Sequence, residues 1–265
     1  MNCDKRTAGG RLVSFSGAVH LVEVHHRARS LPLTSDTAKP YTLVLEGSTY
    51  SSSVAVLRDR EVVAERTIGE DDGSVSRAGR GEKLMPAIAE CLDEAKVDRS
   101  EIARIVCGSG PGSFTSLRVA GSVAKGLATG LGVSLYATSS LLLTVTGVKP
   151  PPPHGEYLSV LDAMRGEFYA ARIVVSATEP PRQTGAPHII TAAELRAISS
   201  VETHLRIIGP GQSLDAHPHA RGVAPILASV LHTGPVDLPS WEPDYGRLAE
   251  AQVRWEAAHG RPLTA

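Results

Sequence analysis

Residues 108–118 read GSGPGSFTSLR, and this stretch decides the fold more than any other part of the chain. A short apolar run at 105–107 precedes it, and a run rich in small residues follows to residue 131. Three glycines within five positions let the backbone turn sharply, and Ser113 and Thr115 can cap a helix that begins there. A strand, a glycine turn and a helix N-terminus in this order often form an anion site. The same pattern also serves a tight strand-to-helix connection that binds nothing.

The composition indicates an ordinary globular α/β protein. The 265 residues are 42% hydrophobic and 21% charged, and only 4% are aromatic. Such a core must be filled by aliphatic side chains, which suits an α/β sheet. Lys and Arg total 27 against 28 Asp and Glu. Because proteins that grip nucleic acid by its phosphates usually carry a basic excess, we expect contact with RNA only together with a partner.

Cysteine usage and hydropathy favour a cytoplasmic protein. Cys3, Cys91 and Cys107 show no CxxC spacing, so neither a disulfide framework nor a zinc site is predicted. No apolar run reaches the roughly 18 residues that a membrane span requires. Residues 1–40 are poor in acidic residues and lack the continuous apolar segment of a signal peptide, so we expect a disordered extension.

Hydrophobic periodicity predicts a first lobe at 41–149. Its expected elements are strands at 42–45, 54–57, 62–67, 104–107 and 133–137, and helices at 82–96, 115–131 and 139–145. A polar loop is expected at 71–81. This order predicts a mixed sheet in which three antiparallel strands are continued by two parallel ones.

Four prolines at 150–153 mark the expected boundary to a smaller C-terminal lobe at 150–234. Its expected elements are strands at 157–161, 167–175 and 205–208, and helices at 192–198 and 223–231. Residues 235–265 form a predicted tail, within which a helix could form at 246–258.

The two longest predicted helices carry the candidate contact surfaces. The first has an apolar stripe formed by Leu84, Ile88, Cys91, Leu92 and Ala95. The second contains three internal glycines, and each costs about 1 kcal/mol relative to alanine. Another element must therefore approach this helix closely, either the chain's own sheet, which is the commoner arrangement, or a helix of a second chain. Arg118, one turn into this helix, either contacts an anion or carboxylate or is a solvated surface residue.

Motifs for catalysis are missing from the sequence. There is no HxxxH or HExxH pair for a metal, no Walker-type phosphate loop and no GxSxG nucleophile turn. Glu46 and Asp162 end predicted strands, as active-site acids often do. Turn chemistry explains each of them equally well.

The glycine stretch resembles the G-P-G-S-F-T-G-L-R signature of the bacterial TsaB (YeaZ) family, whose members are relatives of the TsaD proteins. Further resemblances follow in the family's order, from about Tyr41 to the C-terminus: 82–86, 139–141, the hairpin LDAMRGEFYA at 161–170, and the C-terminal PDYGRLAEA at 243–251. The glycine signature combined with the hairpin motif is specific.

The resemblance implies an actin-like ATPase (ASKHA) fold, with two related lobes of which the second is degenerate. It implies a subunit of the complex that makes threonylcarbamoyladenosine beside the anticodon of tRNA. In that complex a TsaD-like protein carries the metal and transfers the threonylcarbamoyl group. The implied partners are this TsaD-like protein, in a heterodimer through N-terminal-lobe helices, and a TsaE-like ATPase, with tRNA bound only through the complex.

On this reading the chain has no catalytic and no metal-binding residue, and it binds no cofactor alone, whereas ATP and a divalent metal belong to its partners. The isolated chain is expected to homodimerise through the same surface. The predicted partner interface consists of Leu84, Met85, Ile88, Leu92, Ala120, Ala124 and Ala128. The predicted glycine loop consists of Gly110, Pro111, Gly112, Ser113, Phe114, Thr115 and Arg118.

Three departures from the family pattern bear on mechanism: Glu46-Gly47-Ser48 replaces Asp-Thr-Ser, Arg80-Gly81 replaces His-Ser, and Ser116 replaces a glycine. The first two disfavour nucleotide chemistry in this chain. The alternative function is a nucleotide-binding phosphotransferase or hydrolase of the same fold, which would act by itself through Glu46, the glycine loop and Asp162. A protease is disfavoured, because no nucleophile–base pair is visible.

Overall fold

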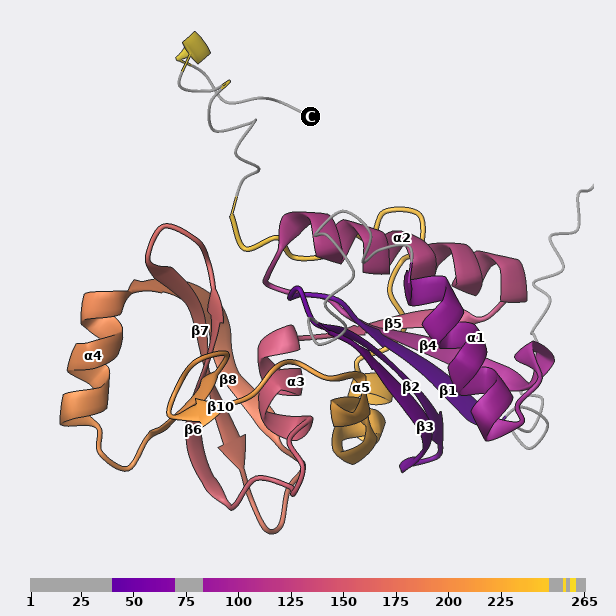
Figure 1. The fold of residues 1–265 in the computed structure, drawn as a ribbon, viewed down its shortest axis with the longest axis horizontal. Helices are drawn as coiled ribbons and strands as arrows, with labels where there is room; N and C mark the ends of the chain where they lie inside the picture. Colours follow the sequence, from indigo (N-terminus) through magenta and orange to yellow (C-terminus); the bar gives the residue numbers. More distant parts are fainter. Residues whose placement is uncertain (1–39, 70–82, 248–254, 256–257, 261–265) are drawn as a thin grey trace, which may run out of the picture. The chain divides into compact units, whose positions relative to one another are not determined.

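The computed structural model describes residues 40–69, 83–247, 255 and 258–260 (Figure 1). The predicted extension before residue 40, the loop expected at 71–81 and most of the helix expected at 246–258 lie outside the described residues. Among the helices of the described part, none combines the length and the apolarity that crossing a membrane requires.

The first lobe is built on one mixed sheet. Its elements are β1 (Tyr41–Glu46), β2 (Ser52–Arg58), β3 (Glu61–Ile68), α1 (Leu84–Ala95), η3 (Arg99–Glu101), β4 (Ile102–Gly108), α2 (Phe114–Leu131), β5 (Ser134–Thr138) and α3 (Ser140–Thr146). The strand order is β3-β2-β1-β4-β5, with β1 antiparallel to β2 and parallel to β4. The predicted mixed sheet is confirmed.

The second lobe repeats this arrangement in a reduced form. Its elements are β6 (Gly155–Asp162), β7 (Glu167–Val175), β8 (Arg182–Thr191), α4 (Ala192–Val201), β9 (Arg206–Gly209) and β10 (Leu214–Asp215). The order β10-β9-β6-β7-β8 matches the first sheet strand for strand, since β6, β7 and β8 form the meander and β9 runs parallel to β6. No helix separates β9 from β10, where α2 lies in the first lobe.

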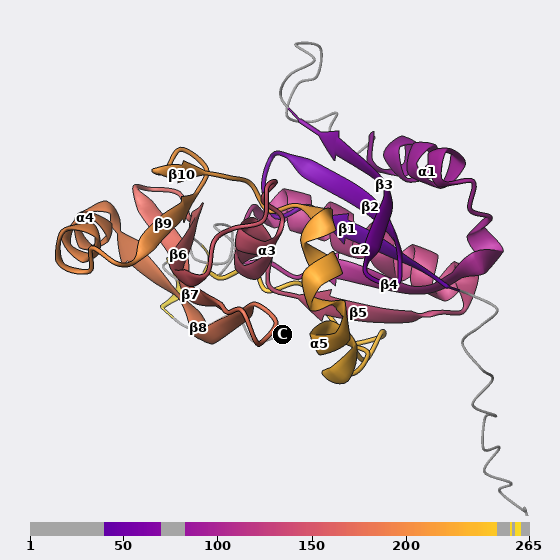
Figure 2. The ribbon, with the colours of Figure 1, turned by 90° about the horizontal axis from the view of Figure 1, so that it is seen from below.

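The last helices of both lobes pack against the sheet of the other lobe. Leu141 and Val145 of α3 pack into the core of the second sheet, beside Tyr157, whereas Leu143 of the same helix packs into the core of the first. The 3-10 helix η4 (Ala220–Ile226) and helix α5 (Leu227–His232) follow the second sheet but cover the first, where Val223 and Leu227 join the core (Figure 2). The boundary expected at residues 150–153 had assigned η4 and α5 to the second lobe. Because α1 and α2 both lie on the other face of the first sheet, this face needs a cover from elsewhere in the chain.

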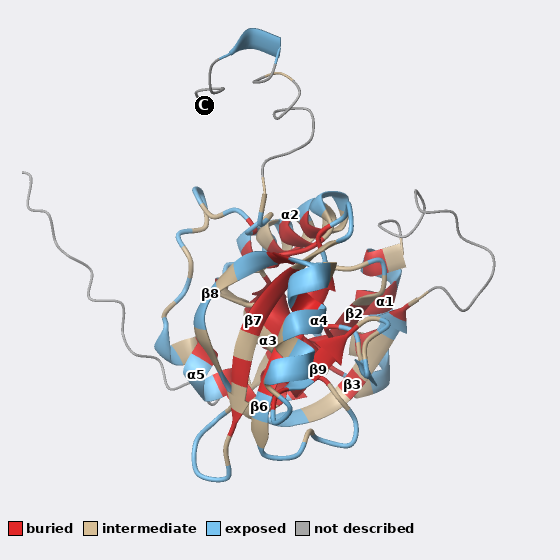
Figure 3. Ribbon diagram, turned by 90° about the vertical axis from the view of Figure 1, so that its left-hand side faces the viewer, coloured by how far each residue is buried: buried red, intermediate tan, exposed pale blue. Residues whose placement is uncertain are grey.

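Helices α1 and α2 turn their apolar stripes toward their own sheet (Figure 3). The core on this face contains Leu84 and Ile88 of α1, Ala120 and Ala124 of α2, and Leu43 of β1. The small alanines bring the axis of α2 close to the strands. Of the two arrangements open from the sequence, packing against the chain's own sheet accounts for these residues.

The segment that follows α5 returns to the first lobe, and we call residues 235–247 the C-terminal strap. The N–H of Val236 donates to the carbonyl of Leu135 on the edge strand β5 (2.9 Å). Further along, Lys125 of α2 donates to the carbonyl oxygen of Trp241 (2.9 Å). The strap therefore lies along α2 and is part of the fold.

One glycine of α2 is required by the strap. A Cβ atom on Gly121 would lie 2.9 Å from Cγ of Pro243, which is closer than packed carbon atoms approach. A Cβ on Gly126 or Gly130 would meet nothing within 4 Å. Close contact with the strap therefore explains the glycine at position 121. No contact within the described residues explains the glycines at positions 126 and 130.

The carboxylate of Glu46 joins three parts of the first lobe. It is fully buried and accepts the N–H of Ser48 (2.6 Å) and the hydroxyl of Ser140 (3.0 Å). The Ser140 hydroxyl oxygen also accepts the N–H of Gly110 in the glycine loop (3.1 Å). A Cβ on Gly108 would overlap the Glu46 carboxylate. Burial raises the pKa of Glu46 above its ordinary value, although the hydrogen bonds oppose this.

A buried histidine fixes η4 against β3. Nδ1 of His219 accepts the backbone N–H of Arg221 (3.1 Å) and its Nε–H (2.9 Å), so Nε2 carries the ring proton and donates to Oγ1 of Thr67 (3.0 Å). Burial, assisted by the nearby Arg221 charge, lowers the pKa of His219 from 6.5 to about 4. The folded chain therefore holds this ring neutral.

Gly108→Ala is expected to lower the free energy of unfolding by roughly 3 kcal/mol or more, because the new methyl group displaces the Glu46 carboxylate from its buried hydrogen bonds. The matched control is Gly126→Ala in the open part of α2, which should gain up to about 1 kcal/mol. Urea unfolding of both variants measures the difference. Equal midpoints would show that the space around Gly108 is not tight.

The chain should lose stability as the pH falls from about 6.5 toward 4, since the unfolded state binds a proton at His219 that the folded state excludes. This histidine contributes up to about 3 kcal/mol across that window. His219→Gln should flatten the dependence, and His232→Gln on the exposed end of α5 should leave it unchanged. Urea unfolding at a series of pH values gives both slopes, and identical slopes for the two variants would contradict the assignment.

Candidate functional site

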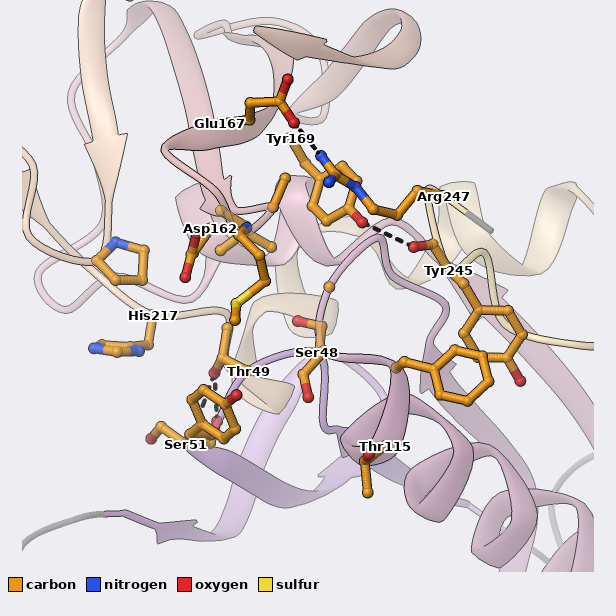
Figure 4. Close-up of a pocket in the computed structure, with 18 of the residues that line it drawn as sticks. Ser48, Thr49, Ser51, Thr115, Asp162, Glu167, Tyr169, His217, Tyr245 and Arg247 are labelled. Carbon is orange, nitrogen blue, oxygen red and sulfur yellow. Dashed lines mark hydrogen bonds and ion pairs between the residues drawn. The ribbon is translucent and has the colours of Figure 1, made fainter. Parts of the chain in front are cut away.

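A cleft of about 1410 Å³ lies where β1 and β6 end (Figure 4). Its walls come from the β1–β2 turn, the β6–β7 turn and the start of α2. Two residues of the strap, Tyr245 and Arg247, also line it. The cleft thus occupies the position at the carboxyl ends of strands where α/β folds commonly bind ligands.

The glycine loop is packed against the β1–β2 turn. The N–H of Ser113 donates to the carbonyl of Ser48 (2.7 Å), and a Cβ on Gly112 would overlap that same carbonyl group. Gly110 and Pro111 are buried, and a Cβ on Gly110 would overlap the carbonyl of Asp244 in the strap. These glycines serve close backbone contact within the chain.

The start of α2 differs from the capping pattern expected from sequence. Ser113 occupies the N-cap position, but its side chain makes no capping hydrogen bond. Its hydroxyl instead accepts a hydrogen bond from Ser116 (3.1 Å), the residue that replaces a family glycine. Ser113, Phe114 and Thr115 all line the cleft.

Arg118 contacts an aromatic ring. Its guanidinium lies 5.2 Å from the centroid of Phe114, whose ring in turn packs against Tyr245 at 4.6 Å. This geometry is a cation–π contact on an aromatic pair. A carboxylate contact of Arg118, one of the two roles open from the sequence, is not among the interactions of the described residues.

Asp162 shapes the opposite turn. Its carboxylate accepts the N–H of Met164 (2.7 Å), and Met164, Arg165 and Gly166 all have positive φ angles, of 65°, 61° and 77°. Asp162 is exposed and lines the cleft. Turn formation, one of the two explanations open from sequence, accounts for the contact that it makes.

Two of the family-like motifs bind each other across the cleft. Arg247 of the strap pairs with Glu167 (2.7 Å), and the hydroxyl of Tyr169 donates to the carbonyl of Tyr245 (3.0 Å), as Figure 4 shows. Sequence reasoning recorded both motifs but gave these residues no role. Arg247 and Glu167 each lie within one of these motifs, but no spacing in the sequence links the two residues.

The cofactor that an actin-like fold implies is a nucleotide with its metal, and the residues present do not fit it. Glu46 is fully buried, and its carboxylate already accepts hydrogen bonds from Ser48 and Ser140. The N–H groups of Ser109, Gly110 and Ser113 already donate to partners within the chain. No group of three or more His, Cys, Asp or Glu side chains suited to a metal occurs among the described residues.

Exposed large apolar side chains gather at the cleft. Seven large apolar side chains are exposed in the described part of the chain. Four of them line this cleft: Tyr50, Phe114, Met164 and Ile189.

The predicted partner interface needs correction. Leu84, Ile88, Ala120, Ala124 and Ala128 are buried in the chain's own core, and Leu92 is half-buried. The reason is that an apolar stripe has the same spacing whether it faces a sheet or a partner. Of the seven residues, only Met85 is exposed, at 48%.

The outer faces of α1 and α2 carry mainly small or uncharged residues. Exposed positions there are Met85 and Ala89 on α1, and Ser122, Gly126 and Gly130 on α2. Glu90 and Glu94 of α1 pair with Arg66, so the charge of this side of α1 is partly neutralised. Asp93 of α1 and Arg118 of α2 are exposed as well, so this surface combines small side chains with a few charged ones.

The sequence is similar to those of several known proteins. A family model described as TsaD, tRNA N6-adenosine threonylcarbamoyltransferase, matches residues 75–199. The tRNA threonylcarbamoyladenosine biosynthesis protein TsaB of Bacillus subtilis is 23% identical over 231 residues, which cover 80% of this chain and 96% of that protein. TsaB of Escherichia coli is 26% identical over 129 residues, which cover 49% of this chain and 53% of that protein.

The fold also matches a solved structure. A crystal structure of an uncharacterized protein with similarity to peptidase YeaZ from Pseudomonas aeruginosa superposes with a TM-score of 0.63 at 24% identity, covering 78% of this chain and 99% of that one. The two mixed sheets, the helices that pack across the lobes and the glycine loop thus form an actin-like ATPase-type fold. In sequence, in its motifs and in its fold, the chain is similar to the TsaB (YeaZ) family.

Proposed function

We propose that the chain is a non-catalytic subunit of the machinery that makes threonylcarbamoyladenosine in tRNA, where it binds and activates a TsaD-like threonylcarbamoyltransferase. The observation that carries this proposal is the burial of Glu46. The one carboxylate placed at the end of β1, where an ATPase of this fold needs a reactive acid, is tied to Ser48 and Ser140 and is sealed from the cleft. The names of the curated relatives supply the pathway.

The other reactive groups of the described residues support a non-catalytic role. Cys91 and Cys107 are buried, and burial raises the pKa of both thiols, that of Cys91 to about 11. A thiol held protonated is a poor nucleophile. The hydroxyl of Thr67 lies beside a histidine, but His219 donates its Nε2 proton to that hydroxyl and cannot remove a proton from it.

The outer faces of α1 and α2 are the proposed surface for the TsaD-like partner. Both helices cover the same face of the first sheet, so a pair of partner helices can pack on them (Figure 1). Gly126 and Gly130 lie one turn apart on the exposed side of α2 and let another helix approach closely. Their cost of about 1 kcal/mol each to helix stability is not offset inside the chain.

The remaining partner and cofactor assignments follow from the proposed non-catalytic role of this chain. ATP and a divalent metal act on the partners, which include a TsaE-like ATPase, and tRNA meets this chain only in the complex. In isolation the same surface supports a homodimer. The rival function, an autonomous nucleotide-dependent phosphotransferase, requires Glu46 to reach the cleft, and its carboxylate is turned into the core.

Met85→Glu and Gly126→Gln should each weaken binding to the TsaD-like protein by roughly tenfold, because each places a large polar side chain on the proposed surface. Gly126→Gln is expected to raise helix stability at the same time, so lost binding cannot be ascribed to misfolding. Val201→Glu, which changes a side chain 79% exposed on the second lobe, is the control. Calorimetric titration gives the affinities, and unchanged binding by both variants would remove α1 and α2 from the interface.

Deleting the gene should abolish threonylcarbamoyladenosine, measured by mass spectrometry of tRNA, and the chain expressed from a plasmid should restore it. Glu46→Gln should restore it to within about twofold, since an amide still accepts the Ser48 N–H. A catalytic acid would instead lose about 100-fold or more in a reconstituted reaction. That loss, in a variant that still binds its partner, would favour the phosphotransferase. Synthesis by the purified chain alone would refute the proposal outright.

A further inference from the structure

A second pocket, of about 450 Å³, shares no lining residue with the cleft. It is formed by the β2–β3 turn, the C-terminal end of α3, the proline run, the end of β7 and the 3-10 helix η4. Its volume lies in the range of small-ligand sites. We call it the junction pocket, because its residues come from both lobes.

The junction pocket is basic, in a chain whose formal net charge is −1. Four basic side chains line it, and no Asp or Glu does: Arg60, Lys149, His154 and Arg221. Glu65, which lies outside the lining, pairs with Lys149 (2.6 Å) and with Arg221 (3.2 Å). One carboxylate shared by two cations leaves one positive charge unmatched. Arg60 donates to the carbonyl of Pro225 (3.2 Å) and makes no ion pair with the described part of the chain. Its charge is therefore the second unmatched positive charge at this pocket.

The cations are held in place before any ligand arrives. Glu65 anchors Lys149 and Arg221, and the Pro225 carbonyl orients one nitrogen of Arg60, whose other N–H groups remain as donors. Four prolines with fixed φ angles supply much of the wall: Pro151, Pro152, Pro181 and Pro225. Since little side-chain or backbone freedom is left to lose, binding at this pocket has a small ordering cost.

We propose that the junction pocket binds a phosphate group, supplied either by an RNA backbone or by a free phosphorylated small molecule. Arginine forks and a lysine are the side chains that bind phosphate through charge-assisted hydrogen bonds. Two unmatched positive charges at one small pocket suit a phosphate, which carries one or two negative charges. The pocket gives this chain an anion contact of its own. This goes beyond the proposed function, in which the chain meets tRNA only in the complex.

The test uses the full chain with two probes, inorganic phosphate in calorimetry and a fluorescent single-stranded RNA oligonucleotide in anisotropy. Arg60→Gln and Lys149→Gln should each weaken binding by roughly tenfold, which corresponds to the loss of one charge-assisted hydrogen bond. Both side chains are exposed, so neither substitution should change the midpoint temperature of thermal unfolding. Arg221 is left unchanged because it holds His219. Arg196→Gln, which removes an exposed cation from α4, is the matched control.

The two probes distinguish the sources of the phosphate. RNA binding that phosphate competes away and that weakens with rising salt supports the backbone source. Saturable binding of phosphate without RNA binding supports the small-molecule source. Failure of both probes to bind saturably, or equal binding by wild type and the Arg60→Gln/Lys149→Gln double variant, would overturn the proposal.

Discussion

The buried carboxylate of Glu46 is the constraint on which the first lobe depends. An isolated carboxylate would be costly in this core, and the N–H of Ser48 and the hydroxyl of Ser140 make its burial tolerable. Through Ser140 the same group holds the glycine loop at Gly110, and it leaves room only for glycine at position 108. One side chain thus fixes the β1–β2 turn, the end of β4 and the start of α3. The carboxylate of this strand-end acid therefore has a structural role in the first lobe.

The C-terminal strap has a comparable effect between the lobes. Two-lobed enzymes commonly close on their ligands by hinge motion. Here the chain itself spans the cleft edge, since Asp244 donates its N–H to Ser109 in the first lobe (2.7 Å) and Arg247 pairs with Glu167 in the second. A closing motion would have to break these contacts or carry them along. The strap therefore ties the two lobes together at the edge of the cleft.

The sequence predicted the first lobe well, because its strands are short apolar runs that are bounded by turn residues. It missed β8, an edge strand whose run Arg182–Thr191 contains Gly185 and Pro187 and has little apolar alternation. It found α5 but assigned it to the second lobe, since periodicity reveals an apolar face without revealing which sheet that face covers. The same limit explains why Leu84 and Ala124 were expected at a partner interface. The pairing of Arg247 with Glu167 joins residues 80 positions apart, and no local pattern encodes it.

Helix α2 links the strap to the proposed partner surface, because it carries both on adjacent rows of residues. Gly121 and Lys125, one turn apart, hold the strap. Ser122, Gly126 and Gly130 form the neighbouring row and face outward. The strap therefore fixes the position of the helix whose other side is offered to a partner. A surface fixed in advance loses little conformational freedom on binding, so small residues with few contacts of their own can still support a specific interface.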